Sequence, residues 1–230
     1  MPNSSGFHTT RWTQVRQSGG DDTVSQQALS DLCGAYYSPV VIFIARSGFE
    51  ESRARDLAHD FFMRLLASPK TLKPDPARGR FRSYLLGAVK HFVADALDHE
   101  RAQKRGGTAE IMPLTDPVLP PDGGLGPDRA FDRQWALTVI ERGLQQLAHE
   151  FESPDKTAQF ALLKPWLTGD EGELTQAEIA LQLGMNEGAV KVAVHRLRHR
   201  FRELIKTEVS HTVQDTAEVR DELTHLLSAM

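Results

Sequence analysis

The chain has 230 residues, of which 40% are hydrophobic and 25% charged, an ordinary composition for a globular protein with a sizeable core. Its formal net charge of −4 excludes the indiscriminate coating of nucleic acid that a strongly basic chain achieves, so any DNA contact must be local. The single cysteine, Cys33, excludes an internal disulfide and a cysteine-based zinc site and is typical of a reducing cytoplasm. No apolar run approaches the roughly 20 residues of a membrane span, and the polar start is unlike a signal peptide. We therefore expect a cytoplasmic protein without membrane insertion.

The N-terminal part of the chain predicts an arm followed by two helices. Residues 1–24 are polar and rich in glycine and serine, which predicts a loose arm. Ser25 is the expected cap of a helix over about 26–46, in which Pro39 predicts a kink or a division into two. Ser52 is the expected cap of the next helix. The apolar stripe of that helix consists of Leu57, Phe61, Phe62, Leu65 and Leu66.

A loop and a long basic helix follow. Residues 68–80 hold three prolines and one glycine, which predict a loop, and a helix is expected over about 81–105. Seven basic residues oppose three acidic ones between 78 and 105, with aromatic residues among them. Basic side chains follow a nucleic-acid backbone and aromatic faces stack on exposed bases, so this pattern suits a single-strand binder. The alternative, aromatic side chains in a core, is favoured for Phe81 and Phe92, and Tyr84 suits both interpretations.

The second half of the chain begins with a predicted linker. Residues 106–130 contain five glycines and five prolines, and their charge is mostly acidic, which predicts a flexible segment. Apolar spacing then predicts one helix from about Trp135 to Phe151 and another over 157–167. A last amphipathic segment is expected over 213–229. No run alternates with the period of two that a strand requires, so the predicted fold class is all-α.

The stretch 174–206 carries the strongest local signals. Thr175 and Glu178 form a capping box, and Gly184 suits a left-handed helix end. Asn186 is the expected cap of a second helix, whose apolar residues recur at alternating spacings of four and three. Two short helices joined by about three residues form a helix-turn-helix, which sets its second helix in the DNA major groove.

The predicted second helix of this motif is strongly basic. Between 189 and 206, six basic residues stand against Glu203 alone. Such a stripe suits phosphate contacts, which supply most of the sequence-independent affinity for DNA. A solvated helix face on a small bundle is the simpler alternative, but the agreement of turn, caps and charge favours DNA binding.

Four stretches together resemble the extracytoplasmic-function (ECF) RNA polymerase sigma factors. Residues 56–65, DLAHDFFMRL, are similar to the polymerase-binding helix of that family. Residues 79–85, GRFRSYL, are similar to the start of the helix that melts and reads the minus-ten element. Residues 174–183 resemble the first helix of the family's helix-turn-helix, and 188–198, GAVKVAVHRLR, resemble its recognition helix. The resemblance covers roughly 26–206.

The resemblance implies two small helical domains. A sigma region 2 bundle is expected over 25–105 and a sigma region 4 helix-turn-helix over 131–206. The arm at 1–24 and the linker at 106–130 complete this plan, together with a C-terminal extension over 207–230 that carries one more helix. The arm and the extension resemble a long-tailed subgroup of the family.

The implied function is transcription initiation. The protein would bind core polymerase, recognise the minus-ten and minus-thirty-five promoter elements, melt DNA and start transcription. It would make and break no bond itself, and no cofactor or metal is implied. The implied partners are promoter DNA, the β′ clamp helices and β flap of core polymerase, and, as a further candidate, an anti-sigma protein.

The resemblance also assigns site residues. Those implied to dock on core polymerase are Asp56, Leu57, Asp60, Phe62 and Arg64. Those implied to contact the minus-ten element are Lys70, Lys73, Arg78, Arg80, Phe81, Arg82, Tyr84, Lys90 and His91. Those implied to contact the minus-thirty-five element are Thr175, Gln176, Glu187, Lys191, Val192, His195, Arg196, Arg198 and Arg200.

Two alternative functions remain. A helix-turn-helix regulator that never replaces a sigma subunit would have no use for the 56–65 motif or for a second basic helix. A metal-dependent hydrolase is suggested by His91, Asp95 and His99, which share a helix face at i, i+4 and i+8, and by the similar spacing of His195 and His199. Against the hydrolase, a metal is usually held by at least three ligands with a supporting shell, and no second carboxylate-rich helix is evident.

Overall fold

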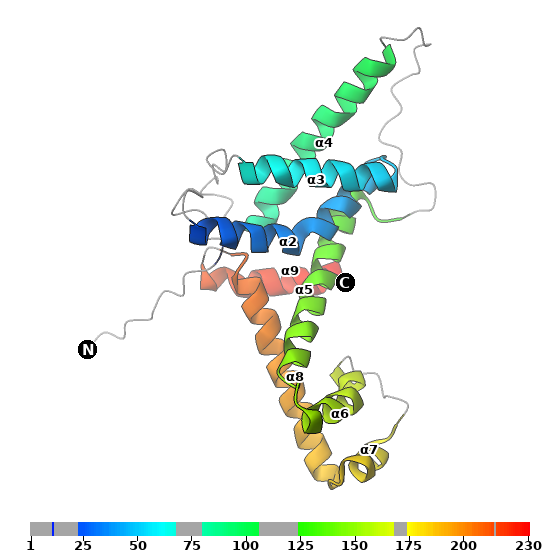
Figure 1. Ribbon diagram of the computed structural model, residues 1–230, viewed down its shortest axis with the longest axis vertical. Helices are drawn as coiled ribbons and strands as arrows, with labels where there is room; N and C mark the ends of the chain where they lie inside the picture. The colour runs from blue at the N-terminus through cyan, green and yellow to red at the C-terminus, as the bar shows by residue number, and fades with distance from the viewer. Residues whose placement is uncertain (1–10, 12–22, 68–79, 106–123, 168–173, 214) are drawn as a thin grey trace, which may run out of the picture. The chain divides into compact units, whose positions relative to one another are not determined.

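The computed structural model describes residues 11, 23–67, 80–105, 124–167, 174–213 and 215–230 (Figure 1). Within these residues every regular element is a helix, and the β structure is limited to an isolated antiparallel bridge between Arg80 and Val213. The all-α prediction is therefore confirmed for this part of the chain. Most of the predicted arm, loop and linker lies outside the described residues.

The helices follow the predicted order closely. Their bounds are α2 Thr23–Arg46, α3 Glu51–Ala67, α4 Phe81–Arg105, α5 Pro127–His149, α6 Pro154–Leu163, η2 Lys164–Leu167, α7 Gln176–Leu183, α8 Glu187–Ser210, η3 Thr216–Glu218 and α9 Val219–Ala229. α5 begins inside the predicted linker, because proline is well suited to the first turn of a helix. α8 continues past Lys206 to Ser210.

Some predicted details of the first helices are wrong. α2 runs from Thr23 to Arg46, so Pro39 does not divide it and Ser25 lies inside the helix and does not cap it. Glu50, not Ser52, caps α3. Its backbone carbonyl accepts from the Ala54 N–H at 2.8 Å, and its carboxylate accepts from the hydroxyl of Ser52.

α2 is also more apolar than expected. Its Gln26–Arg46 segment is, among the described residues, a helix long and apolar enough to cross a membrane by length and composition. The prediction that no run approaches this length is thus wrong. Half of its most apolar 18-residue window is buried inside the protein. The core helix of a globular protein passes the same test of length and composition.

The chain divides into two compact units. Unit 1 comprises residues 1–138 and 209–230, and unit 2 comprises residues 139–208. The divisions fall inside α5 and α8. The predicted C-terminal extension is therefore not a separate appendage, because unit 1 is assembled from both ends of the chain.

The core of unit 1 is built largely from aromatic side chains. α2 and α3 pack against each other (Figure 1). The fully buried Tyr36 ring lies 5.1 Å from the Phe81 ring of α4 and 6.2 Å from the Phe131 ring of α5. Trp135 of α5 and Leu226 of α9 are also buried. Four distant parts of the sequence thus share one core.

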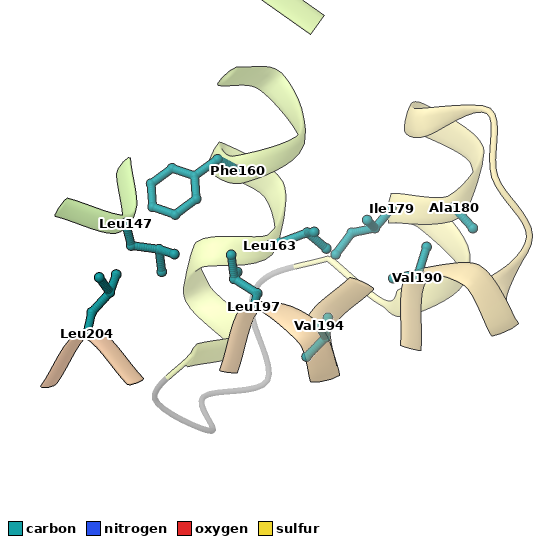
Figure 2. Close-up of a cluster of buried hydrophobic side chains, with 9 residues drawn as sticks. All are labelled: Leu147, Phe160, Leu163, Ile179, Ala180, Val190, Val194, Leu197 and Leu204. Atoms are coloured by element: carbon teal, nitrogen blue, oxygen red, sulfur yellow. The ribbon is translucent and has the colours of Figure 1, made fainter. Parts of the chain in front are cut away.

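The core of unit 2 holds the helix-turn-helix together. Figure 2 shows its nine buried side chains. They are Leu147 of α5, Phe160 and Leu163 of α6, Ile179 and Ala180 of α7, and Val190, Val194, Leu197 and Leu204 of α8. Because every helix of the unit contributes, the angle between α7 and α8 is set by this core.

Candidate nucleic-acid interface

The local geometry of the predicted helix-turn-helix is confirmed in unit 2. The Thr175 N–H donates to the Glu178 carboxylate at 2.7 Å, and the Glu178 N–H donates to the Thr175 hydroxyl at 3.3 Å, which completes the capping box. Gly184 ends α7 with a φ of +64°, and the Asn186 side chain caps α8 by accepting from the Ala189 N–H at 2.8 Å. Three residues separate the two helices, as predicted.

The solvent-facing side of the first half of α8 carries the side chains expected to read DNA. Val190 and Val194 point into the core, so Lys191, His195 and Arg196 lie on the exposed side. Val192 among them is 49% exposed. Lys191 and Arg196 form no ion pair with the residues that the structure describes.

Two other basic residues of α8 are engaged within unit 2. The Arg198 Nε–H donates to the Trp166 carbonyl at 2.7 Å. Arg200 donates from Nε to both carboxylate oxygens of Glu150, at 3.0 and 2.9 Å, and from Nη2. This hydrogen bonding lowers the pKa of Glu150 and raises that of Arg200. The phosphate contacts predicted for these two arginines would therefore compete with contacts inside the protein.

The remaining predicted minus-thirty-five residues lie at the starts of the two helices. Thr175 and Glu187 are exposed, and Gln176 is half-buried. Thr175 already serves as the cap of α7. A helix start directs backbone N–H groups outward, which suits a phosphate contact.

In unit 1, acidic side chains of α5 and α9 hold the arginines at the start of α4. The Arg82 Nε–H donates to Glu222 at 2.7 Å, and its Nη1 donates to Asp132 at 2.7 Å. Arg80 donates from Nη1 to Glu222 at 3.1 Å and from Nη2 to Asp221 at 3.4 Å. Glu222 is fully buried and accepts from both arginines.

The first turn of α4 is consequently not open to a partner in this structure. Phe81 is fully buried, and its N–H donates to the Thr212 carbonyl at 2.9 Å. Arg82 is 7% exposed. Burial alone would lower the pKa of Arg82, but the Glu222 hydrogen bond and the charges of Glu222 and Asp132 raise it. Both residues lie in the core of unit 1 here, as the apolar-core alternative predicts for Phe81.

The other described minus-ten candidates are more accessible. Tyr84 is half-buried, and burial raises its pKa to about 12, so its hydroxyl stays protonated. Lys90 is exposed and pairs with Asp128 at 2.5 Å. His91 is exposed beside it. Lys70, Lys73 and Arg78 lie outside the described residues.

The predicted polymerase-docking residues of α3 separate into two groups. Asp56, Asp60 and Arg64 are exposed, and the Arg64 guanidinium lies 5.2 Å from the centre of the Phe92 ring. Leu57 and Phe62 are buried at 4% and 7% exposure. Leu57 and Phe62 therefore pack on the buried side of α3, whereas the three charged side chains lie on its exposed side.

The arrangement of histidines does not favour the hydrolase alternative. Within the described ranges, no three His, Cys, Asp or Glu side chains gather closely enough to hold a metal ion. His91, Asp95 and His99 share a helix face in sequence but are not gathered into such a group.

Sequence reasoning overlooked the acidic partners in unit 1. Asp132, Asp221 and Glu222 were not singled out, since nothing nearby in the sequence marks them as arginine ligands. One signal was present for Glu222. It lies three residues after Val219 and four before Leu226, on the apolar stripe of α9, where a carboxylate must find a buried partner.

No protein-family model, no curated protein and no solved structure matches this chain. The candidate interface therefore rests on the residues and contacts described above.

Proposed function

We propose that this protein is an RNA polymerase sigma factor of the ECF type, which binds core polymerase, recognises promoter DNA and enables transcription to start. The observation that carries the proposal is the helix-turn-helix of unit 2. Its caps and its three-residue turn present Lys191, His195 and Arg196 on one exposed side of α8. This is the geometry with which such a motif enters the major groove.

In this proposal the first half of α8 reads the minus-thirty-five element. Arg196 forms a bidentate contact with a guanine, which discriminates against other bases by about 1–3 kcal/mol. Lys191 contacts phosphate, and the exposed Val192 packs against a thymine methyl group. Arg198 and Arg200 keep their contacts with Trp166 and Glu150 and hold α8 in place.

Unit 1 supplies the other two activities. Asp56 and Asp60 lie one turn apart on the exposed side of α3, where they meet basic residues of the β′ clamp helices. The part of α4 beyond its buried start, with the half-buried Tyr84 and the exposed Lys90 and His91, faces the minus-ten strand. Aromatic stacking and positive charge together suit a strand whose bases are unpaired. The protein itself catalyses no reaction.

A second candidate is a helix-turn-helix regulator that binds duplex DNA without joining core polymerase. One observation favours it: Arg82 and Lys90 of α4, and Arg80 just before it, all pair with acidic side chains of unit 1, which reduces the charge free for a DNA strand.

Co-purification with core polymerase followed by run-off transcription on genomic fragments separates the two candidates. A sigma factor forms a stable complex with the core enzyme and directs initiation from discrete sites. A regulator binds duplex fragments but neither joins the core enzyme nor starts transcription alone, and that result would replace the first proposal by the second.

A further inference from the structure

The C-terminal segment, defined here as residues 209–230, makes backbone contacts with the start of α4. Arg80 and Val213 form an antiparallel bridge, and the Phe81 N–H donates to the Thr212 carbonyl at 2.9 Å. The first N–H groups of a helix have no partner within the helix itself. The C-terminal segment thus caps α4.

Side chains strengthen this connection. Glu222 of α9 is fully buried and accepts from Arg82 at 2.7 Å and from Arg80 at 3.1 Å. Burial, and then the charge of Glu222, raise the pKa of the buried Tyr36 hydroxyl, which therefore stays neutral beside this group. His225, one turn after Glu222, lies 3.1 Å from Asp132, the second partner of Arg82.

Departure of α9 would remove Glu222 from both arginines and leave Arg82 with Asp132 as its remaining carboxylate partner. Breaking a buried pair from one side is strongly unfavourable, far more than opening an exposed pair. It would also expose the apolar side chain of Leu226, which is 4% exposed on α9. The contact between α9 and α4 therefore has the character of a permanent interface and not of a removable cover.

We propose that the C-terminal segment is a permanent part of the minus-ten edge of unit 1, and that Glu222 is a positioning residue that sets the first turn of α4 and the direction of Arg80. The role assigned to that edge rests on the proposed function. If the C-terminal segment instead blocked this edge and had to detach before DNA bound, loosening it would increase activity, whereas loosening a permanent part of the edge would decrease it.

The neighbouring Asp221 provides a matched control. It contacts the same arginine at 3.4 Å, but its side chain is 73% exposed. Exposed pairs of this kind contribute little, so Asp221→Asn should change binding of a short fluorescein-labelled T/A-rich single strand by no more than about twofold. Glu222→Gln should weaken the same binding by about tenfold or more, because a buried pair is broken. Glu222→Asp keeps the charge and should therefore retain part of the strand binding that Glu222→Gln loses.

Hydrogen exchange at the Phe81 N–H tests the positioning directly. This amide should be protected in the wild-type chain and in Asp221→Asn, and should exchange faster in Glu222→Gln while duplex binding by unit 2 is retained. Unchanged protection in Glu222→Gln would overturn the inference. Stronger strand binding by Glu222→Gln would also overturn it, since that result identifies an inhibitory tail.

A disulfide cross-link tests whether the C-terminal segment ever detaches from the start of α4. Residues facing each other in a bridge of this kind have Cα atoms about 4.5 Å apart, within the range of about 4.4–6.8 Å that a disulfide spans. In the double variant Arg80→Cys and Val213→Cys, Arg80 is absent in both redox states, so the two states differ only in the cross-link. The one native cysteine, Cys33, is buried. Equal or higher strand binding in the oxidised form supports a permanent tail, and a loss that reduction reverses refutes it.

Failure of the proposed function would be distinguishable from failure of this inference. A wild-type chain that neither joined core polymerase nor bound the single strand would remove the sigma assignment. The exchange of the Phe81 amide would still decide whether Glu222 positions α4.

Discussion

The Nε–H of Arg82 donates to a carboxylate oxygen of Glu222 at 2.7 Å, although 140 residues separate them along the chain. The two side chains are buried, at 8% and 0% exposure. Glu222→Ala should therefore lower the free energy of unfolding by up to about 3–5 kcal/mol, because it breaks a buried ion pair and leaves Arg82 only Asp132 as a carboxylate partner. Urea unfolding followed by circular dichroism measures this loss.

The matched control is again the neighbouring carboxylate. Asp221→Ala should cost less than about 1 kcal/mol, since its pair with Arg80 is largely exposed. Replacing Arg82 and Glu222 together by Met and Leu should restore much of the stability lost in Glu222→Ala, because both charges of the most buried pair are then removed. Equal losses at the two acidic positions would contradict a buried role for Glu222.

Arg196 should govern recognition of duplex DNA. Arg196→Ala should weaken binding to the preferred site by about 1–3 kcal/mol and relax the preference for one base pair. Lys191→Ala should weaken binding to all sequences alike and reduce the salt dependence by about one counterion. Fluorescence anisotropy over a range of salt concentrations measures both effects.

Lys156→Ala is the control for this pair. It removes the same charge from an exposed position on α6, away from the turn. Its effect on anisotropy should be small. If it matched the effect of Arg196→Ala, binding would depend on net charge and not on α8.

Asp60 should govern assembly with core polymerase. Asp60→Ala removes an exposed carboxylate from α3 and should weaken the complex with core enzyme, while duplex binding by unit 2 stays unchanged. We expect a loss of about 1–3 kcal/mol if the partner residue becomes desolvated in the complex. Size-exclusion chromatography with core enzyme and anisotropy with duplex DNA separate the two readouts. Asp98→Ala, an exposed acidic change on α4, should leave assembly intact.

The capping box should make the stability of unit 2 depend on pH. Hydrogen bonds from the Thr175 N–H and hydroxyl lower the pKa of Glu178 below its ordinary value of 4.5. A group whose pKa is lower in the folded state makes its full contribution to folding stability at pH values above its unfolded-state pKa. This contribution is therefore complete above pH 4.5 and is lost as the pH falls through the lower folded value. Thermal unfolding across that range should show the loss.

Thr175→Ala should weaken this pH dependence, because only the backbone N–H then still donates to Glu178, and should destabilise the protein by about 1 kcal/mol at neutral pH. Ser153 offers a matched control, because it occupies the N-cap of α6 without a side-chain cap hydrogen bond. Ser153→Ala should therefore change stability much less. A similar loss in both variants would show that the hydrogen bond at Thr175 contributes nothing of its own.

Gly184 should resist substitution for a reason confined to the backbone. Its φ is +64°, and a Cβ at this position meets nothing within 4 Å. Gly184→Ala should cost about 1 kcal/mol through the left-handed conformation alone. Gly126→Ala, also in open space but without a positive φ, should be neutral or slightly stabilising. Thermal unfolding of the two variants tests the difference.

The helices and their ends follow from short-range patterns in the chain. The capping box at Thr175, the left-handed end at Gly184 and the cap at Asn186 each depend on residues within four positions of one another. The apolar spacing along α8 likewise specifies which side of that helix faces the core. These features are legible because propensity, capping and amphipathic period act between near neighbours.

The roles of individual charges depend on the folded chain. In sequence, Arg82 and Arg196 are equally plausible DNA ligands, one in each basic helix. Tertiary packing buries Arg82 against Glu222 and Asp132 and leaves Arg196 in solvent. Burial and distant partners set the energy of a charge, and neither is encoded by its neighbours in the chain. For the same reason the C-terminal residues become part of unit 1 only when both ends of the chain meet.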